Sequence, residues 1–303
     1  MKRQTVDLDG PVHYVDFGGA GPAIVLVHGL GGSHANWLSV APRLIDHGRV
    51  LAIDLAGHGH TPSQGRTARV GANRRLLGCF LDEVAREPAV LIGNSMGGYI
   101  SLAEAAAEPD KVAGLVLVDP AIPRAPGAGF DARVIAFFAG VLLPGIGAAM
   151  MRRRGHRSAE QNVRENLALC CVDPSRVDAD VVAAHIALAR ERVAYGPVVG
   201  RDFLDAVRSL TARLVRRRRF YEMVATIQAP ALIVQGERDR LVRVEAARAL
   251  VAARPDWHLE VLDDIGHVPQ LEAPARFLEV VEPWLRARAS GASINSVDLS
   301  INT

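Results

Sequence analysis

The sequence predicts an α/β protein with a mostly parallel central sheet, helices on both faces of the sheet, and an inserted helical cap. Three observations support this prediction. Apolar runs of strand length alternate with helical stretches through the first 120 residues. The alternation stops after residue 120 and resumes from residue 227 onward. Hydrophobic residues make up 49% of the 303 residues, which is enough to form a sizeable core.

The amino-terminal part contains apolar runs that we interpret as strands, separated by stretches of helical composition. Residues 23–28 form a continuous apolar run, which is typical of a strand buried on both faces of a parallel sheet. The expected strands are residues 11–17, 23–28, 49–54, 89–94 and 112–119. The expected helices are residues 37–47, 66–86 and 96–107.

The middle of the chain lacks a clear buried strand. Its expected helices are residues 133–143, 158–169, 179–193 and 198–214. Strands at 231–235 and 258–262, with helices at 245–253 and 275–287, then restore the alternation. We therefore expect a core of residues 1–120 and 227–289 and a helical cap of residues 121–226. The Ser/Asn-rich residues 290–303 are expected to form a disordered tail.

The most informative stretch is the apolar run at 89–94, because it ends in Gly93-Asn94-Ser95-Met96-Gly97. Between a strand and a helix, the pattern Gly-x-Ser-x-Gly holds the serine at the apex of a sharp turn. The two glycines leave room where strand and helix approach, so the strained serine backbone can be accommodated. An ordinary glycine-rich turn could show the same pattern, but the flanking strand and helix favour Ser95 as a nucleophile.

A serine hydroxyl is a poor nucleophile at neutral pH and needs a neighbouring base. His267 lies in the loop after the last expected strand. Loops at the carboxyl ends of parallel strands meet at one edge of the sheet, and Ser95 lies on that edge. His28, His58 and His60 also lie near strand ends and compete for the role, but the position of its loop favours His267.

The base in turn needs an anion that fixes its tautomer and stabilises its protonated form. Asp239 follows the next-to-last expected strand and therefore reaches the same edge of the sheet. The resulting order of nucleophile, acid and base along the chain is that of a known triad arrangement. Asp119, at the end of the strand at 112–119, is the rival acid, although it could simply fix a turn. Glu237 and Asp263 are interpreted as solvated loop charges.

Two backbone N–H groups are needed to stabilise the oxyanion of an acyl-transfer intermediate. Met96 would supply one, because it starts a helix whose dipole favours negative charge there. The loop His28-Gly29-Leu30-Gly31-Gly32 would supply the other, through the N–H of Leu30. A phosphate-binding turn is the alternative for this loop. It lacks both the lysine of a P-loop and the spacing of a dinucleotide-binding motif.

Charge and cysteine content narrow the classes of partner. The formal net charge is +2, so nothing in the overall charge indicates a nucleic-acid partner. The four arginines at 216–219 are interpreted as a solvated face. Cys79, Cys170 and Cys171 are too few and too unevenly spaced for a disulfide framework. Residues 1–10 are charged and lack the apolar core of a signal peptide, so we expect a cytoplasmic protein.

Residues 134–151 form a run of 18 residues without a charge, followed by three arginines. This length is at the threshold for a membrane span, and the arginines resemble a positive flank. Gly140, Pro144, Gly145 and Gly147 interrupt the run, which favours cap helices. A weak contact of the cap with a membrane surface is kept as a secondary expectation.

The chain resembles the α/β-hydrolase family across roughly residues 11–288. The resemblance rests on short motifs that occur in the family's order. They are His28-Gly29-Leu30-Gly31-Gly32, Asp54-Leu55-Ala56-Gly57-His58-Gly59, Gly93-Asn94-Ser95-Met96-Gly97-Gly98, Gly236-Glu237-Arg238-Asp239 and Gly266-His267-Val268-Pro269. The resemblance implies the α/β-hydrolase fold with Ser95, Asp239 and His267 as triad and Leu30 and Met96 as oxyanion donors.

The resemblance also implies which branches of the family the chain fits. Serine at position 95 disfavours the dehalogenase and epoxide-hydrolase branches, which have aspartate there. The motif around Ser95 is similar to cofactor-free haloperoxidases and, in particular, to carbon–carbon bond hydrolases of aromatic degradation. The latter usually have Trp directly after the base, where this chain has Val268. The segment at 54–59 resembles a structural turn of the family, so His58 is not expected to be catalytic.

The predicted function is hydrolysis of a carboxylic ester, or a related acyl bond, of an apolar small molecule through an acyl-enzyme. The expected pocket residues are Phe137, Phe138, Leu142 and Val268, although packing of the cap onto the core would explain the cap residues equally well. The mechanism needs no metal and no organic cofactor. Perhydrolysis or carbon–carbon cleavage by the same triad and a non-enzymatic ligand-binding protein are the alternatives.

Overall fold

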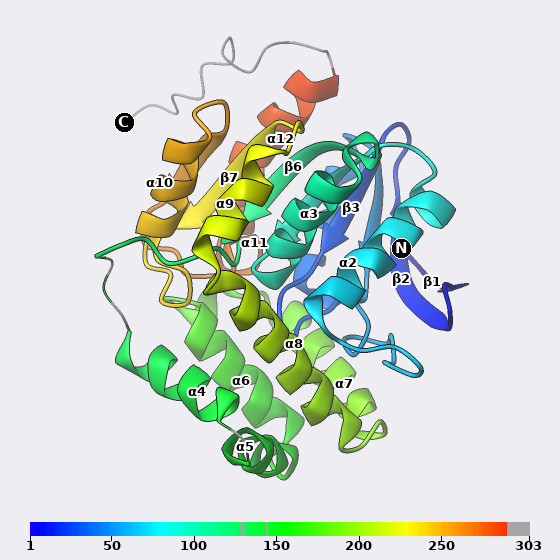
Figure 1. Cartoon of the computed structure of the whole chain (residues 1–303). Coiled ribbons are helices and arrows are strands. Elements are labelled where there is room, and N and C mark those ends of the chain that lie inside the picture. Colours follow the sequence, from blue (N-terminus) through cyan, green and yellow to red (C-terminus); the bar gives the residue numbers. More distant parts are fainter. Residues whose placement is uncertain (128, 130, 144, 290–303) are drawn as a thin grey trace.

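The computed structural model describes residues 1–289 except 128, 130 and 144. The tail expected at 290–303 lies outside the described residues. A central sheet is covered by helices, and a further group of helices lies at one end of the sheet (Figure 1). This arrangement confirms the predicted α/β class with a mostly parallel sheet.

The described residues form one sheet of eight strands in the order β1-β2-β4-β3-β5-β6-β7-β8. The strands are β1 (Lys2–Asp7), β2 (Pro11–Gly18), β3 (Ala23–Val27), β4 (Arg49–Ile53), β5 (Ala89–Asn94), β6 (Val112–Val118), β7 (Ala231–Gly236) and β8 (His258–Leu262). Strands β1 and β2 pair antiparallel at one edge, and all pairings from β4 to β8 are parallel. The carboxyl-terminal ends of the parallel strands therefore all lie at the same end of the sheet. The predicted placement of Ser95, Asp239 and His267 requires this.

Both faces of the central strands are buried, which explains their continuous apolar sequences. On β3, Val25 and Val27 belong to one hydrophobic cluster, whereas Ile24 and Leu26 belong to the cluster on the opposite face, with Trp284. Successive side chains of a strand point to opposite faces, so a strand covered on both sides must be apolar at every position. The continuous apolar sequence at 23–28 therefore correctly predicts a strand that is buried on both faces.

Helices cover both faces of the sheet. The first face carries α2 (Val70–Phe80), α3 (Met96–Ala107), α9 (Arg217–Ala225) and α10 (Val244–Ala253). The second face carries α1 (Ala41–Leu44) and α12 (Pro274–Ala289). The remaining helical segments of this part are short: η1 (His34–Trp37), η2 (Leu81–Ala85), η3 (Pro109–Lys111) and α11 (Pro269–Glu272).

Apart from α9, the helices between β6 and β7 pack through two smaller hydrophobic clusters. These helices are α4 (Ala132–Leu142), α5 (Ile146–Gly155), α6 (Ala159–Cys170), the turn η4 (Pro174–Arg176), α7 (Ala179–Val193) and α8 (Val198–Leu214). One cluster joins α4, α5 and α8, and the other joins α6, α7 and α11. Helix α8 also contributes Ala206 and Leu210 to the main core, so it connects the inserted helices to the sheet (Figure 1).

Some expected elements differ in the structure. Residues 37–47 do not form one helix, because Pro42 lacks the N–H that a helix interior needs, and the chain forms η1 and α1 instead. The helix expected at 66–86 begins at Val70 and ends in the π-helical turn η2. Strand β1 was not expected because its side chains are almost all exposed, so it lacks an apolar pattern. Helix α9 was also not expected, and α5 was expected only in so far as the run at 134–151 was interpreted as cap helices.

The apolar run at 134–151 forms parts of two helices rather than one. Among the described residues, no single helix is both long and apolar enough to cross a membrane. Residues 134–142 and 146–155 reach the length and apolar character of a membrane span only when the two helices are taken together. The two helices are bent by 109° relative to each other.

Candidate active site

Ser95 lies in a sharp turn between β5 and α3, as the motif predicts. Its backbone has φ 54° and ψ −116°, a combination that is strained for a residue with a side chain. The Ser95 N–H donates to the carbonyl of Val118 (2.9 Å), and the Ser95 carbonyl accepts from the N–H of Ala121 (2.9 Å). Val118 ends the neighbouring strand β6 and Ala121 follows it closely, so the sheet holds the strained residue in place.

Two glycines allow the close approaches that this turn requires. A Cβ on Gly97 would lie 2.1 Å from the carbonyl oxygen of Val27, so only glycine lets α3 approach β3 this closely. A Cβ on Gly29 would lie 3.1 Å from the Cβ of Ser95. The loop that was expected to supply an oxyanion donor is therefore directly beside the serine.

His267 and Asp239 form a hydrogen-bonded pair. Nδ1 of His267 lies 2.7 Å from Oδ2 of Asp239, and both side chains are buried. The other carboxylate oxygen of Asp239 accepts from the N–H groups of Leu241 (2.7 Å) and Val242 (3.1 Å). With Nδ1 donating to Asp239, the neutral ring keeps its lone pair on Nε2, the tautomer that a general base needs.

The loop that carries His267 is fastened on two sides. The side-chain amide of Asn94 donates to the carbonyl of His267 and to that of Val118, each at 3.1 Å. The N–H of His267 donates to the carbonyl of Cys170 at the end of α6 (2.6 Å). Because Asn94 directly precedes Ser95, these contacts bring the loop that carries His267, here called the base loop after the predicted role of His267, next to the serine turn.

The base loop is also held by Glu272, a contact that the sequence did not predict. The buried carboxylate of Glu272 accepts from the N–H of Gly266 with one oxygen and from those of Val172 and Asp173 with the other, all at 2.8 Å. It thereby joins the base loop to the segment after α6. A glutamate in a short helical turn carries no motif, so only the folded contacts reveal this role.

Asp119, the rival acid, lies beside Asp239 rather than in its place. One oxygen of Asp119 accepts from the side chain of Gln235 (2.7 Å) and from the N–H of Gly236 (2.9 Å). Burial, together with the charge of Asp239, raises the pKa of Asp119 well above its usual value. The ring of His267 is bonded to Asp239 and not to Asp119.

Two of the competing histidines have structural contacts. Nε2 of His28 accepts from the N–H of Leu55 (3.1 Å), and Nδ1 of His28 donates to the carbonyl of Gly29 (2.7 Å). His58 donates from Nδ1 to the carbonyl of Ala56 (3.1 Å). Burial lowers the pKa of His28 to about 4 and that of His58 to about 3, so both rings are neutral at neutral pH. The third, His60, is paired with Glu191 (2.6 Å).

The two expected oxyanion donors flank the serine turn. Met96 is the first residue of α3, so its N–H has no carbonyl one turn earlier to bond. The loop around Leu30 is closed by a hydrogen bond from the N–H of Gly32 to the carbonyl of Gly29 (3.1 Å). The side chain of Leu30 packs against the cluster formed by α4, α5 and α8.

The expected pocket residues fall into two clusters. Phe137, Phe138 and Leu142 pack in the same cluster as Leu30, and the rings of the two phenylalanines lie edge to face at 5.4 Å. These three side chains thus share a cluster with Leu30, the residue expected to supply an oxyanion donor. Val268 is buried in the other cluster, with α6 and α7.

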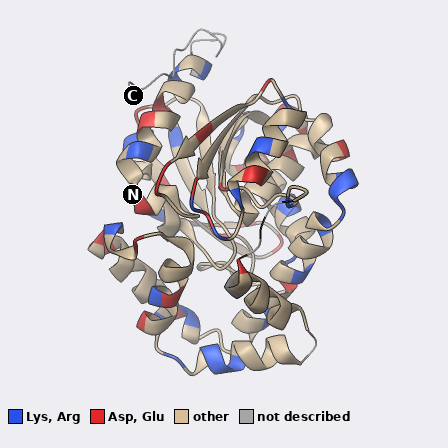
Figure 2. Cartoon of the chain, turned by 90° about the vertical axis from the view of Figure 1, so that its left-hand side faces the viewer, with Lys and Arg blue, Asp and Glu red and all other residues tan. Residues whose placement is uncertain are grey.

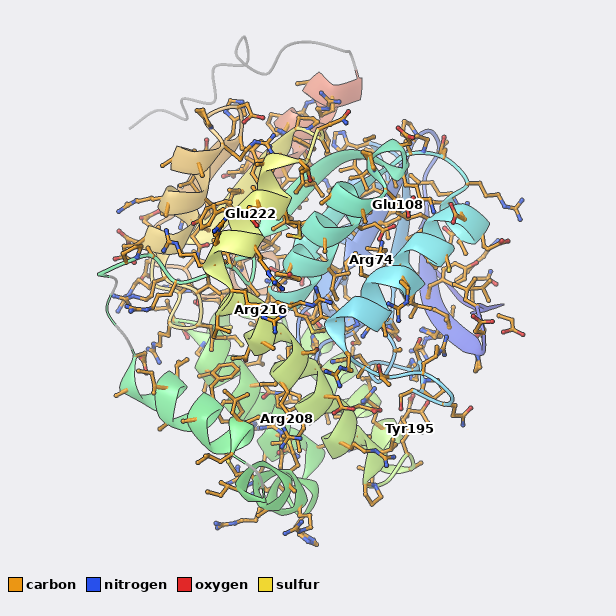
Figure 3. All side chains as sticks on the ribbon, viewed as in Figure 1. Arg74, Glu108, Tyr195, Arg208, Arg216 and Glu222 are labelled. Atoms are coloured by element: carbon orange, nitrogen blue, oxygen red, sulfur yellow. The ribbon has the colours of Figure 1, made fainter. Side chains whose placement is uncertain are left out.

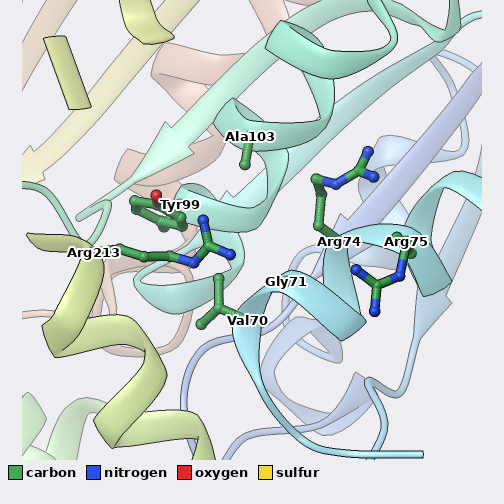
Figure 4. A pocket seen from close by; sticks show the side chains of 7 residues that line it. All are labelled: Val70, Gly71, Arg74, Arg75, Tyr99, Ala103 and Arg213. Atoms are coloured by element: carbon green, nitrogen blue, oxygen red, sulfur yellow. The ribbon is translucent and has the colours of Figure 1, made fainter. Parts of the chain in front are cut away.

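A cavity of about 100 Å³ lies outside this site (Figure 4). It is located where α2, α3 and α8 meet, and three of its side chains are arginines. Its lining residues are Val70, Gly71, Arg74, Arg75, Tyr99, Ala103 and Arg213. Arg74 is paired with the buried carboxylate of Glu104 (2.8 Å), which accounts for one of the charges. None of the expected site residues lines this cavity.

Charged residues of both signs are spread over the outer helices, whereas the central strands are largely uncharged (Figure 2). The basic run at 216–219 begins just before α9, where Arg216 and Glu222 lie along the same segment (Figure 3). Arg217 donates to the carbonyl of Arg124 (2.9 Å), and Arg218 forms an ion pair with Glu222 (2.7 Å). These contacts agree with the interpretation of the run as a solvated face.

The three cysteines Cys79, Cys170 and Cys171 are free, as expected. Burial raises the pKa of the Cys170 thiol to about 12, and it also raises the pKa of Cys171 above its usual value. Neither thiol is therefore ionised at neutral pH, although Cys170 contacts the base loop.

Known proteins resemble this chain over almost its entire length. A model of the alpha/beta hydrolase family matches residues 24–280. The chain is 29% identical over 281 residues to a 2-hydroxy-6-oxononadienedioate/2-hydroxy-6-oxononatrienedioate hydrolase from Burkholderia vietnamiensis, covering 91% of each chain. It is 26% identical over 285 residues to 2-hydroxy-6-oxononadienedioate/2-hydroxy-6-oxononatrienedioate hydrolase 1 from Dechloromonas aromatica, covering 92% of each.

The fold also matches solved structures. A haloalkane dehalogenase from Agrobacterium tumefaciens superposes with a TM-score of 0.80 at 19% identity, covering 95% of this chain and 97% of the dehalogenase. At this identity the likeness concerns the fold alone. The chain belongs to the alpha/beta hydrolase family, and it is a hydrolase enzyme. The alternative of a non-enzymatic binding protein is therefore set aside.

Proposed function

We propose that this enzyme is a serine hydrolase in which Ser95 is the nucleophile, His267 the base and Asp239 the acid. The observation that carries the proposal is the 2.7 Å contact between Nδ1 of His267 and Asp239, in a loop that Asn94 ties to the serine turn. The strained backbone of Ser95 supports the same role, because strain of this kind is maintained only where the surrounding structure enforces it.

The proposed reaction is transfer of an acyl group to water. His267 takes the proton of the Ser95 hydroxyl through Nε2 as the serine oxygen attacks the carbonyl carbon. The N–H groups of Leu30 and Met96 stabilise the resulting oxyanion. The protonated His267 then gives its proton to the departing alcohol, which leaves an acyl-enzyme. His267 next removes a proton from water, the hydroxyl adds to the acyl carbon, and collapse of the second intermediate releases the acid and restores Ser95.

We propose a small apolar ester as the substrate class. The apolar side chains of Phe137, Phe138 and Leu142 lie in the same cluster as Leu30, so they border the loop that would bind the oxyanion. An apolar surface next to the reacting carbonyl favours a substrate with a large apolar acyl group. In this proposal residues 121–226 act as the cap over a core of residues 1–120 and 227–289.

Hydrolysis of a carbon–carbon bond is the second candidate function. It is favoured by the relatives from Burkholderia vietnamiensis and Dechloromonas aromatica, which are hydrolases of 2-hydroxy-6-oxononadienedioate and 2-hydroxy-6-oxononatrienedioate. The same triad could serve this reaction, in which a carbonyl is attacked and a stabilised carbanion leaves and is protonated. The residue directly after His267 is Val268, where carbon–carbon bond hydrolases usually have Trp. Its side chain packs in the cluster with α6 and α7.

A substrate comparison separates the two candidates. The purified enzyme is assayed with p-nitrophenyl esters of increasing acyl length and with 2-hydroxy-6-oxononadienedioate. Ester hydrolysis predicts kcat/KM that rises with acyl length and exceeds that for the dienedioate. A preference for acetyl with no gain on lengthening would contradict the apolar pocket, and a higher kcat/KM for the dienedioate would favour the second candidate.

A further inference from the structure

A cluster of imidazole rings surrounds one buried carboxylate on the side of the molecule that carries β2. His13 comes from β2, His34 from η1, Asp54 from the segment after β4, and His60 from the loop that follows. One nitrogen or oxygen atom from each of these four residues lies within 4.8 Å of all the others. The four residues are therefore brought together by the fold and not by a local sequence motif.

All three rings present the same atom to the carboxylate. Nδ1 of His13 lies 2.9 Å from Oδ2 of Asp54, Nδ1 of His34 lies 3.1 Å from it, and Nδ1 of His60 lies 3.8 Å from it. The ring centroids are 4.7 to 5.6 Å apart. Three nitrogen atoms and one oxygen atom thus converge on one small volume.

The ring of His60 is oriented from its far side. Nε2 of His60 lies 2.6 Å from the carboxylate of Glu191 on α7, whereas Nδ1 is buried and has no hydrogen-bond partner among the described residues. A carboxylate that accepts the outer N–H of a histidine fixes its tautomer and leaves the inner nitrogen with its lone pair. This carboxylate–histidine arrangement is characteristic of histidines that bind metal ions.

Hydrogen bonding alone does not account for the whole cluster. Asp54 already accepts from the backbone N–H groups of His34 (2.7 Å) and His60 (2.9 Å), as well as from the rings of His13 and His34. The carboxylate of Asp54 thus has its hydrogen-bond donors without the ring of His60, and the pair of His60 and Glu191 is not needed for that purpose.

We propose that His13, His34, Asp54 and His60 form a binding site for one divalent transition-metal ion, and that Zn²⁺ fits it best. Imidazole nitrogen and carboxylate oxygen are ligands that zinc accepts, and four protein ligands are typical of a structural zinc site. The ligand atoms would contract to a spacing of about 3.3 Å around the ion, as zinc–ligand distances near 2 Å require. On binding, the Nδ1 protons of His13 and His34 move to Nε2, so both rings stay neutral.

The site would connect the core to an inserted helix. Glu191 belongs to α7, and the next residue, Arg192, donates to the carbonyls of Gly57 (2.8 Å) and Gly59 (2.6 Å) in the same core turn. In Figure 1, α7 is the inserted helix on the side of β1 and β2. An ion bound here would hold β2, η1 and this turn together, and Glu191 would extend that restraint to α7. His13 and His60 are partly exposed, with side-chain exposures of 11% and 17%, which gives the ion a route of entry.

The test is metal binding by the full chain after treatment with a chelator. Zn²⁺ is titrated by calorimetry, and Co²⁺ is titrated by its visible absorption, which reports the coordination of the ion. We expect one equivalent of either ion, a four-coordinate Co²⁺ spectrum, and a midpoint of thermal unfolding that rises with Zn²⁺ concentration. Failure to bind one equivalent would overturn the proposal.

Variants locate the ion. His60→Gln should weaken Zn²⁺ binding by at least about 100-fold, and Glu191→Gln by about 10- to 100-fold, because it removes the partner that orients His60. The side chain of Glu191 is 55% exposed, so this variant should fold even if His60→Gln does not. The exposed His156→Gln is the matched control and should bind normally. Unchanged affinity in Glu191→Gln, or binding lost in His267→Asn instead, would contradict the proposed site.

Discussion

Two buried carboxyl groups lie at the ends of neighbouring strands, and their surroundings differ. Asp239 accepts from two backbone N–H groups and from the ring of His267, which suits an ionised carboxylate. Asp119 is wholly buried, and its pKa is raised by this burial, by the charge of Asp239 and by a hydrogen bond to Asp239. Gln235 contacts both carboxyls, at 2.7 Å and 3.3 Å. The difference in environment favours Asp239 as the acid and Asp119 as a neutral neighbour.

Replacing the acid tests this assignment. Asp239→Asn should lower kcat by about 10⁴-fold, because the amide would favour the tautomer of His267 that carries its proton on Nε2. Asp119→Asn should keep activity within about a few-fold, since Asn can replace a protonated carboxyl. Steady-state kinetics on a p-nitrophenyl ester measures both. A greater loss in Asp119→Asn than in Asp239→Asn would reverse the roles.

The raised pKa of Asp119 also predicts a dependence of stability on pH. The unfolded chain releases this proton at a pH of about 4, whereas the folded chain retains it to higher pH. Folding therefore takes up a proton above about pH 4, and the contribution of Asp119 to stability falls as pH rises from there to the folded pKa. Asn does not titrate, so Asp119→Asn should not show this loss of stability with rising pH. Urea unfolding at several pH values should show the variant gaining stability relative to the wild type as pH rises, and parallel curves would contradict the shift.

At the scale of elements, the contact between β3 and α3 sets the position of the nucleophile. A Cβ on Gly97 would lie 2.1 Å from the carbonyl oxygen of Val27, so α3 would have to move away from the sheet. We expect Gly97→Ala to lower the free energy of unfolding by about 3 kcal/mol. Gly155→Ala in α5 is the matched control, because a Cβ at that position would have no neighbouring atom within 4 Å.

Chemical denaturation of both glycine variants measures these effects. Gly155→Ala should be neutral or stabilising by up to about 1 kcal/mol, as alanine favours helices over glycine. Equal stability of Gly97→Ala and Gly155→Ala would show that the close approach of α3 and β3 is not required.

Sequence patterns predicted the sheet elements well because the central strands are largely apolar, as β3 is at every position, and because Gly93, Ser95 and Gly97 form a local motif. Features that depend on distant contacts could not be predicted. Glu272 acts through N–H groups about a hundred residues away in the chain, at positions 172 and 173. The one-turn helix at 41–44 replaced a longer expected helix, and Pro42 was a visible signal for that break.

At the scale of the whole molecule, the inserted helices and the core share interactions. Helix α8 contributes Leu204 and Val207 to the cluster with α4 and α5, and Ala206 and Leu210 to the main core. His267 also bonds to the end of α6. These shared contacts indicate that the inserted helices and the core unfold as one unit.

Two spectroscopic probes test this cooperativity. Trp37, Trp257 and Trp284 lie in the main core clusters, so their fluorescence reports the core, whereas far-ultraviolet circular dichroism reports all helices. The two denaturation curves should coincide. A loss of helical signal before the fluorescence changes would show that the inserted helices unfold independently.

The central claim is that Ser95 is an activated nucleophile, and labelling with a fluorophosphonate tests it most directly. The reagent is added to the wild type, to Ser95→Ala and to the control Ser175→Ala, whose serine is exposed on η4. Intact mass and peptide mapping should show one adduct on Ser95 in the wild type and in Ser175→Ala, and none in a folded Ser95→Ala. No adduct on the wild type, or the same adduct on Ser95→Ala, would contradict the account.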